Sequence, residues 1–156
     1  ERAAGYGPLE SIAAGPGIAR QARLALEQDP SLGSILRQVV DGDVKKVTAK
    51  EVFAAAREGD SLCQELVERT TLYLGILLAN MASLLDLETI VVGGGVSRAG
   101  AQLLDPLRWI VNQLAPYPPE IEISQLQEDA TILGAVSSVL DLRESYIQFS
   151  QLDWER

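Results

Sequence analysis

Three consecutive glycines, Gly93 to Gly95, are the residues of this chain whose spacing most clearly suggests chemistry. They follow the apolar, β-branched run TIVV and precede a helical pattern, so we place them in a strand-to-helix turn. Such a turn offers unpaired backbone N–H groups and the positive end of a helix dipole, with no Cβ atoms in the way of a phosphate or a flat ring. The turn therefore predicts a nucleotide-type site.

The spacing alone leaves a second interpretation open. The stretch GGGVSRAG has no Lys-Ser/Thr pair of a P-loop, and it does not match the dinucleotide-binding fingerprint. The glycines could instead relieve crowding in a tight turn. Arg98, in the first helical turn after them, either approaches a phosphate or the ribose or is a surface arginine.

The other reactive residue types form no catalytic or metal-binding set. The chain has one cysteine, Cys63, and no histidine, which excludes a disulfide framework and a Cys/His zinc site. Asp41 and Asp43 flank a turn glycine, and Asp105 precedes a proline, so we expect these carboxylates to be solvated. Cys63 has no basic neighbour on its helix and is expected to be an inert packing residue. We predict no catalytic residue and no metal ligand in this chain.

Length and charge limit the remaining possibilities. The 156 residues, 47% of them hydrophobic, predict one domain over residues 1–156 with an irregular lead-in at 1–8. A net charge of −9 without a Lys/Arg cluster argues against a nucleic-acid partner. The longest apolar stretch, residues 71–87, is shorter than the ~20 residues of a membrane span, so we expect no membrane partner. The single cysteine favours a reducing, cytoplasmic location. The chain opens on Glu1 and not on Met, which we interpret as part of a larger protein.

Periodicity and capping signals predict a helix-rich α/β domain. Helices are expected at 9–14, 17–28, 32–40 (capped by Ser31), 49–58, 61–86, 97–114 and 130–149, with strands at 89–92 and 121–124. Thr48 and Glu51 form a capping box before the fourth helix, and Asp60 or Ser61 caps the fifth. The fifth helix is apolar nearly all round from residue 71, so we expect it to be packed on several sides. The strand at 89–92 is expected to be buried and the one at 121–124 to alternate. The two are expected to be parallel, in a sheet too small to stand alone, which implies missing strands or an unusual assembly that replaces them.

The segment ANMASLLDLETIVVGGGVSRAGAQLLDPLR, residues 79–108, closely resembles the ROK family of repressors and sugar kinases. Residues 8–23, 49–66 and 129–140 also resemble stretches of that family, so the likeness covers about residues 7 to 140. The family's fold is the actin-like, ribonuclease H-like ATPase architecture. By this resemblance the chain is the C-terminal lobe, and Gly93, Gly94 and Gly95 belong to an adenosine-binding motif and lie against ATP.

The resemblance also implies a sugar contact. The end of the family's signature CxCGxxGCxE matches Gly7-Pro8-Leu9-Glu10, so Glu10 keeps the position that contacts a sugar hydroxyl. A carboxylate suits that role because its paired acceptor oxygens can bind vicinal hydroxyls. Pro8 replaces a zinc cysteine, so no zinc is expected. The alternative for Glu10 is a solvated glutamate favoured by a helix dipole.

The family's catalytic aspartate, phosphate loop and upstream ExGH segment do not occur in these residues. The resemblance therefore implies the ATP-side lobe of a glucokinase-like sugar kinase, dimeric, using ATP with Mg²⁺ in its full-length parent, and inactive by itself. A second possibility is the sugar-sensing, dimerising core of a ROK-type transcriptional regulator. A third is a non-catalytic helical fragment that associates with itself through uncovered strand edges and apolar patches.

Overall fold

The computed structural model describes residues 7–126 and 129–152, with side-chain surroundings for 7–126 and 129–140. Part of the predicted lead-in, residues 1–6, lies outside the described residues. The helices are α1 (Glu10–Ala13), α2 (Gly15–Gln28), α3 (Ser34–Val39), η1 (Val44–Lys46), α4 (Ala49–Arg57), α5 (Ser61–Leu85), η2 (Gly95–Ala99), α6 (Ala101–Leu114) and α7 (Asp129–Leu152). The strands are β1 (Thr89–Val92) and β2 (Glu120–Ile123). The predicted helix-rich α/β class is confirmed.

The two strands form a parallel pair, as the sequence predicted. Thr89 pairs with Glu120 and Val92 with Ile123, with α6 joining the strands along the chain. Side chains alternate along both strands, so one face carries the partly or fully buried Ile90, Val92, Ile121 and Ile123. The other face is open, and Val91 is 60% exposed. The expectation of a buried strand was therefore right for one face only.

Helix α5 is the spine of the fold, with α6 and α4 as its main packing partners. Gly75 sits where α5 crosses α6, and a Cβ atom there would lie 2.5 Å from Cγ2 of Ile110. The two helices approach closely because this position has no side chain. The core contains apolar residues from α2, α4, α5 and α6, among them Ile18, Val52, Leu66 and Leu107.

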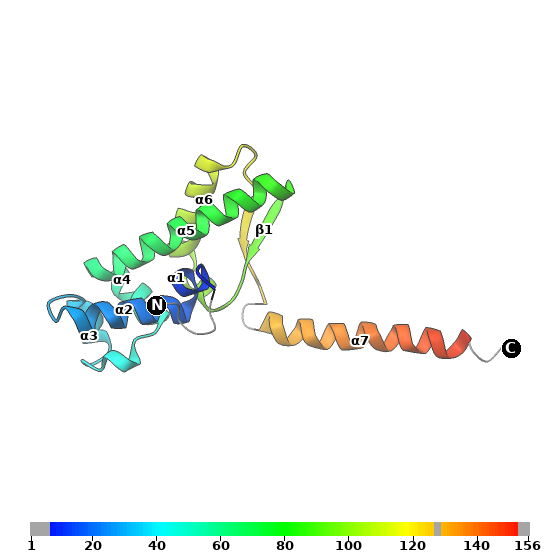
Figure 1. The fold of residues 1–156 in the computed structure, drawn as a ribbon, viewed down its shortest axis with the longest axis horizontal. Helices are drawn as coiled ribbons and strands as arrows, with labels where there is room; N and C mark the ends of the chain where they lie inside the picture. Colours follow the sequence, from blue (N-terminus) through cyan, green and yellow to red (C-terminus); the bar gives the residue numbers. More distant parts are fainter. Residues whose placement is uncertain (1–6, 127–128, 153–156) are drawn as a thin grey trace.

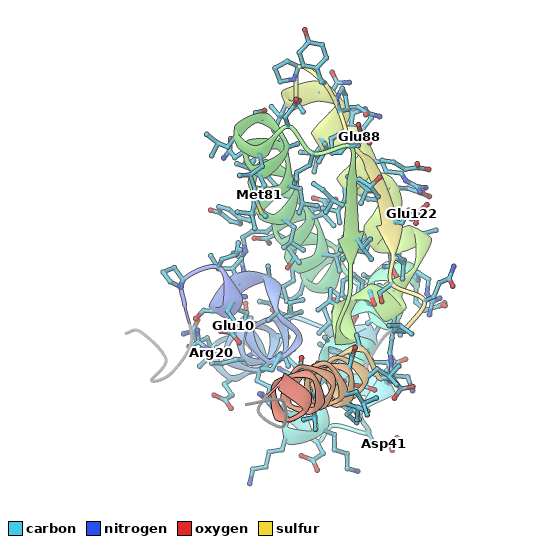
Figure 2. All side chains as sticks on the ribbon, turned by 90° about the vertical axis from the view of Figure 1, so that its right-hand side faces the viewer. Glu10, Arg20, Asp41, Met81, Glu88 and Glu122 are labelled. Atoms are coloured by element: carbon cyan, nitrogen blue, oxygen red, sulfur yellow. The ribbon has the colours of Figure 1, made fainter. Side chains whose placement is uncertain are left out.

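One side of α5 is exposed, which corrects the expectation that it is packed on several sides. Tyr73 is 44% exposed, Met81 38% and Leu84 82%. Figure 2 shows Met81 on the side of α5 turned away from β1. The sequence pattern indicates only how apolar each side of the helix is. It does not indicate how many neighbouring elements cover each side.

The first turns of α3 and α5 share one carboxylate. Asp60 is 3% exposed, and its Oδ1 accepts a hydrogen bond from the N–H of Cys63 (3.1 Å), so the predicted cap of α5 is confirmed. Its Oδ2 accepts from the N–H groups of Ile35 (3.0 Å) and Leu36 (3.1 Å) in α3. The predicted cap Ser31 is wrong, because the chain enters α3 through Gly33, whose φ of +65° is left-handed.

The other helix boundaries need smaller corrections. The capping box of Thr48 and Glu51 is present at α4. The helix expected at 97–114 is two helices, because Gly100 (φ +60°, ψ −132°) breaks the backbone between η2 and α6. The last helix begins at Asp129 and extends away from the rest of the described chain (Figure 1).

Candidate functional site

The glycine turn has a defined internal geometry. Gly94 has φ +80° and ψ −179°, a region that is accessible essentially only to glycine. Its carbonyl oxygen accepts hydrogen bonds from the N–H (3.1 Å) and from Oγ (2.7 Å) of Ser97. Ser97 is 1% exposed, so this anchor is buried. The turn is therefore fixed by its acceptor side, which leaves its donor side to be accounted for.

The three glycines of the turn are exposed, and their N–H groups are its remaining donors. Among the described residues, none of the backbone hydrogen bonds of turns, loops and caps is donated by Gly93, Gly94 or Gly95. A Cβ atom on Gly93 would make an ordinary 3.6 Å contact with Cβ of Ser124, and one on Gly95 would meet nothing within 4 Å. Internal crowding therefore does not require glycine at positions 93 and 95.

The structure brings Glu10 and the glycine turn to the same pocket. A pocket of about 430 Å³ is lined by Glu10, at the start of α1, and by Gly93, Gly94 and Gly95. Helix α1 is held against α2 at Gly17, where a Cβ atom would lie 2.4 Å from the backbone oxygen of Ser11. The two sites named from the sequence, more than 80 residues apart, thus share one cavity.

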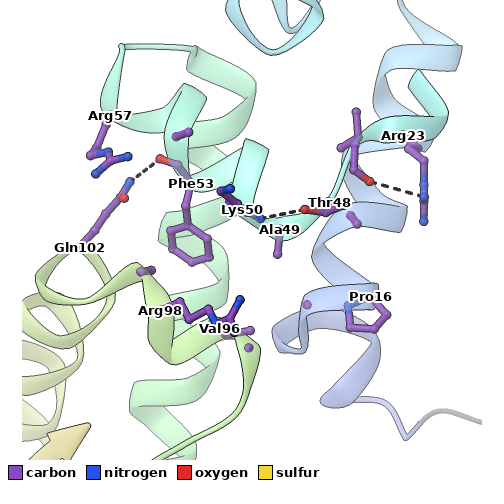
Figure 3. Close-up of a pocket in the computed structure, with 16 residues that line it drawn as sticks. Pro16, Arg23, Thr48, Ala49, Lys50, Phe53, Arg57, Val96, Arg98 and Gln102 are labelled. Carbon is purple, nitrogen blue, oxygen red and sulfur yellow. Dashed lines mark hydrogen bonds between the residues drawn. The ribbon is translucent and has the colours of Figure 1, made fainter. Parts of the chain in front are cut away.

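A larger pocket of about 730 Å³ adjoins the other side of the turn. Three walls enclose it: one from α2 and the Val47–Thr48 segment, one from α4, and one from η2 and the start of α6 (Figure 3). The lining residues include Pro16, Ala19, Arg23, Lys50, Phe53, Ala54, Arg57, Val96, Arg98, Ala99 and Gln102. Gly15, Pro16, Gly95 and Val96 line both pockets, so the glycine turn lies at their boundary.

The larger pocket combines an apolar interior with a basic rim. Phe53 is 5% exposed and lines the pocket together with small apolar residues such as Ala19 and Ala54. Four cations, Arg23, Lys50, Arg57 and Arg98, line the pocket, and no carboxylate is among its described lining residues. In a chain of net charge −9 this cluster is a local positive field, which favours an anionic ligand.

The contribution of α4 to this pocket was not predicted from the sequence. Lys50, Phe53 and Arg57 follow one another at spacings of three and four residues, so they share a face of α4. From the sequence, this helix has only a capping box and a resemblance to the ROK family. Two cations on either side of an aromatic residue were the available signal. Only the fold shows that this face lines a pocket together with η2, with Phe53 buried and Lys50 and Arg57 exposed.

The described residues do not fit a magnesium site by themselves. Glu10 is the one carboxylate among the described residues that line either pocket. Within residues 7–126 and 129–140, no group of three or more His, Cys, Asp or Glu side chains is placed to hold a metal ion. We therefore assign no step to a metal on this chain. In the part of the chain that the structure describes, no helix is both long and apolar enough to cross a membrane.

Comparison with known proteins now decides the family. The model of the ROK family matches residues 5–141 of the chain. The chain belongs to the ROK family. It is 36% identical over 133 residues to the glucokinase of Halalkalibacterium halodurans, an alignment that covers 82% of this chain and 39% of that protein. It is 27% identical over 112 residues to the xylose repressor of Caldicellulosiruptor bescii, covering 69% of this chain and 28% of that protein.

A solved ROK structure confirms the fold. The crystal structure of a ROK family glucokinase from Streptomyces griseus, in complex with glucose and AMPPNP, superposes with a TM-score of 0.68 at 30% identity. The superposition covers 81% of this chain and 42% of that protein. The predicted actin-like ATPase fold is therefore confirmed for this ROK chain. The chain spans about two fifths of the length of the curated glucokinases that it matches.

Proposed function

We propose that this chain is the C-terminal, ATP-side lobe of a ROK-family sugar kinase whose full-length form transfers the γ-phosphoryl group of ATP to a hexose such as glucose. The nucleotide occupies the larger pocket and the glycine turn, and the sugar contacts Glu10. The single observation that carries this proposal is the position of the turn between an apolar, basic pocket and a pocket that holds a carboxylate.

The larger pocket has the chemistry that a nucleotide requires. A purine base needs flat apolar surface, and Phe53 and the neighbouring alanines supply it. Phosphates need backbone N–H groups and cations, and the exposed amides of Gly93 to Gly95 and the basic rim supply both. The match to glucokinases, including one solved with AMPPNP, supports the same ligand class.

The smaller pocket suits the acceptor of the phosphoryl group. Glu10 is exposed there, and its two oxygens can accept hydrogen bonds from neighbouring sugar hydroxyls. Both pockets meet at Gly95. Phosphates that extend from the larger pocket along the glycine turn are therefore directed toward the sugar. Holding two reactants in such an order is the main contribution of a protein to phosphoryl transfer.

The rest of the proposal concerns the full-length parent. That parent supplies the catalytic aspartate, the phosphate loop and the ligands of Mg²⁺, and it works as a dimer in the cytoplasm. The isolated chain then binds ATP weakly and does not phosphorylate glucose, because closure of two lobes around the substrates is required for transfer. Measurable turnover of glucose and ATP by this chain alone would contradict this division of labour.

Substitution of Gly95 tests the nucleotide site directly. The Gly95→Leu variant should keep the unfolding midpoint of the native chain, because a Cβ atom there meets no atom within 4 Å. It should weaken ATP binding at least about tenfold in isothermal titration, since the side chain fills the space proposed for the phosphates. Gly134→Leu on α7, where a Cβ atom also meets nothing within 4 Å, is the matched control and should bind ATP normally. Equal ATP affinity of Gly95→Leu and the native chain would refute the site.

A regulator is the second candidate, favoured by the match to the xylose repressor. In that case the same two pockets sense ligands, and a DNA-binding segment belongs to the rest of the parent. An assay of the full-length protein separates the two: glucose-dependent ADP release identifies the kinase, and sugar-dependent release from operator DNA identifies the regulator.

A further inference from the structure

Gln102 connects two walls of the larger pocket. It lies on α6, and its Nε2 donates a hydrogen bond to the backbone oxygen of Phe53 on α4, at 3.0 Å (Figure 3). The side chain is partly buried and lines the pocket beside Phe53 and Arg57. No role for this residue was predicted from the sequence.

That hydrogen bond fixes which end of the amide a ligand meets. The oxygen of Phe53 can only accept, so the nitrogen of the amide must face it, and Oε1 is held on the other side. Among the described residues, no hydrogen bond to this Oε1 is found. Since every buried side-chain oxygen and nitrogen of the described residues has a partner, Oε1 is not buried. Oε1 is therefore an accessible, oriented acceptor on a residue that lines the pocket.

Gln102 lies in the same pocket as the glycine turn, on a different wall. Gly95 begins η2, Gln102 lies in the first turn of α6 beyond the break at Gly100, and both line the pocket with Phe53. A nucleotide with its phosphates on the glycine turn and its base beside Phe53 therefore brings the edge of the base to Gln102. Adenine presents an amine donor on that edge, whereas guanine and hypoxanthine present a carbonyl acceptor.

We propose that Gln102 is a specificity-determining residue, and that its oriented Oε1 selects nucleotides with a 6-amino purine over those with a 6-oxo purine. This inference rests on the proposed nucleotide site. An oxo group facing Oε1 leaves two acceptors opposed and unpaired, which disfavours it. Arg57 lines the same pocket and is the competing group, because a guanidinium would donate to an oxo group.

The test compares ATP with inosine triphosphate, whose purine carries an oxo group in place of the 6-amino group. Isothermal titration of the 156-residue chain should show ATP binding about tenfold more tightly than inosine triphosphate. Gln102→Met removes both polar atoms, and Gln102→Lys retains a donor for the Phe53 oxygen but no acceptor. Both variants should lose the preference, and Gln102→Lys controls for the loss of the link between α4 and α6.

The possible results separate the inference from the proposed function. If the native chain binds neither nucleotide, the nucleotide site itself is refuted. If it binds both equally, or prefers inosine triphosphate, the nucleotide site stands and the role of Gln102 is refuted, with Arg57 as the dominant group in the second case. If ATP preference survives in Gln102→Lys and Gln102→Met, the selection lies elsewhere. Loss of preference in both variants supports the inference.

Discussion

Replacing Asp60 tests whether one buried carboxylate stabilises the fold by capping both α3 and α5. Its two oxygens accept three backbone hydrogen bonds, at 3.0 to 3.1 Å, from α3 and α5. The side chain is 3% exposed, and Leu36 and Cys63 are fully buried. In Asp60→Ala, water therefore cannot easily replace the carboxylate at these N–H groups.

The expected loss can be worked from these three contacts. Each buried donor left without a partner costs roughly 1–2 kcal/mol, and loss of the α5 cap is part of that sum, so Asp60→Ala should lower the free energy of unfolding by about 3–5 kcal/mol. In Asp60→Asn one oxygen becomes an amide nitrogen, which cannot accept a hydrogen bond, so the side chain can no longer cap both α3 and α5. We expect this variant to lose about 2–3 kcal/mol of unfolding free energy. Domains of this size are stable by only about 5–15 kcal/mol, so either loss is easily measured.

Urea unfolding followed by far-ultraviolet circular dichroism measures these differences. Asp43→Ala is the matched control, because Asp43 also caps a helix but is exposed and accepts a single hydrogen bond, from the N–H of Lys45 at 3.1 Å. It should cost less than about 1 kcal/mol. If Asp60→Ala is no more destabilised than Asp43→Ala, the shared cap is not a stabilising contact and the reasoning fails.

Three further predictions follow from single positions. Gly75→Ala should destabilise the chain by about 1–3 kcal/mol in the same assay despite the higher helix propensity of alanine, because the new methyl group would lie 2.5 Å from Ile110; unchanged stability would contradict the close helix crossing. Gly94→Ala should cost about 1–3 kcal/mol because of its φ of +80°, whereas Gly95→Ala should be neutral, and equal effects would refute the assigned turn. Burial, together with the nearby Asp60, raises the pKa of the Cys63 thiol, so this thiol should resist alkylation at pH 8 until the chain unfolds. Because the folded pKa is the higher one, the contribution of this thiol to stability should be constant below about pH 8 and should fall as pH rises above the thiol pKa of the unfolded chain, near 8.5. Cys63→Ala should remove that fall.

Local signals in the sequence predicted most of the elements well. The capping box at Thr48, the cap at Asp60 and the apolar run at 89–92 are all interactions between near neighbours in the chain. The parallel pairing also followed, since two short strands joined by a helix have few other arrangements. Where a boundary depends on neighbouring residues, periodicity and capping chemistry were sufficient.

Long-range contacts account for what the sequence did not predict. The N-terminus of α3 is capped by Asp60, 24 residues away from Leu36, so the search for a local cap selected Ser31 wrongly. From residue 72 on, the exposed side of α5 also carries large apolar residues, such as Leu72, Tyr73 and Leu84, so apolar character could not separate it from the buried side. The larger pocket joins three walls from distant segments, and no single segment of the sequence carries its pattern.

The relation between the two pockets explains the glycine run better than either pocket alone. Gly94 is required by its backbone conformation, but Gly93 and Gly95 are not required by conformation or by packing within the described chain. Gly95 lines both pockets, so a side chain there would project into the space where they meet. In the function proposed above, a nucleotide would pass its phosphates from the basic pocket toward Glu10 across that space. The proposal thus accounts for the absence of side chains on either side of Gly94, whereas a turn that served only to reverse the chain would need glycine at one position.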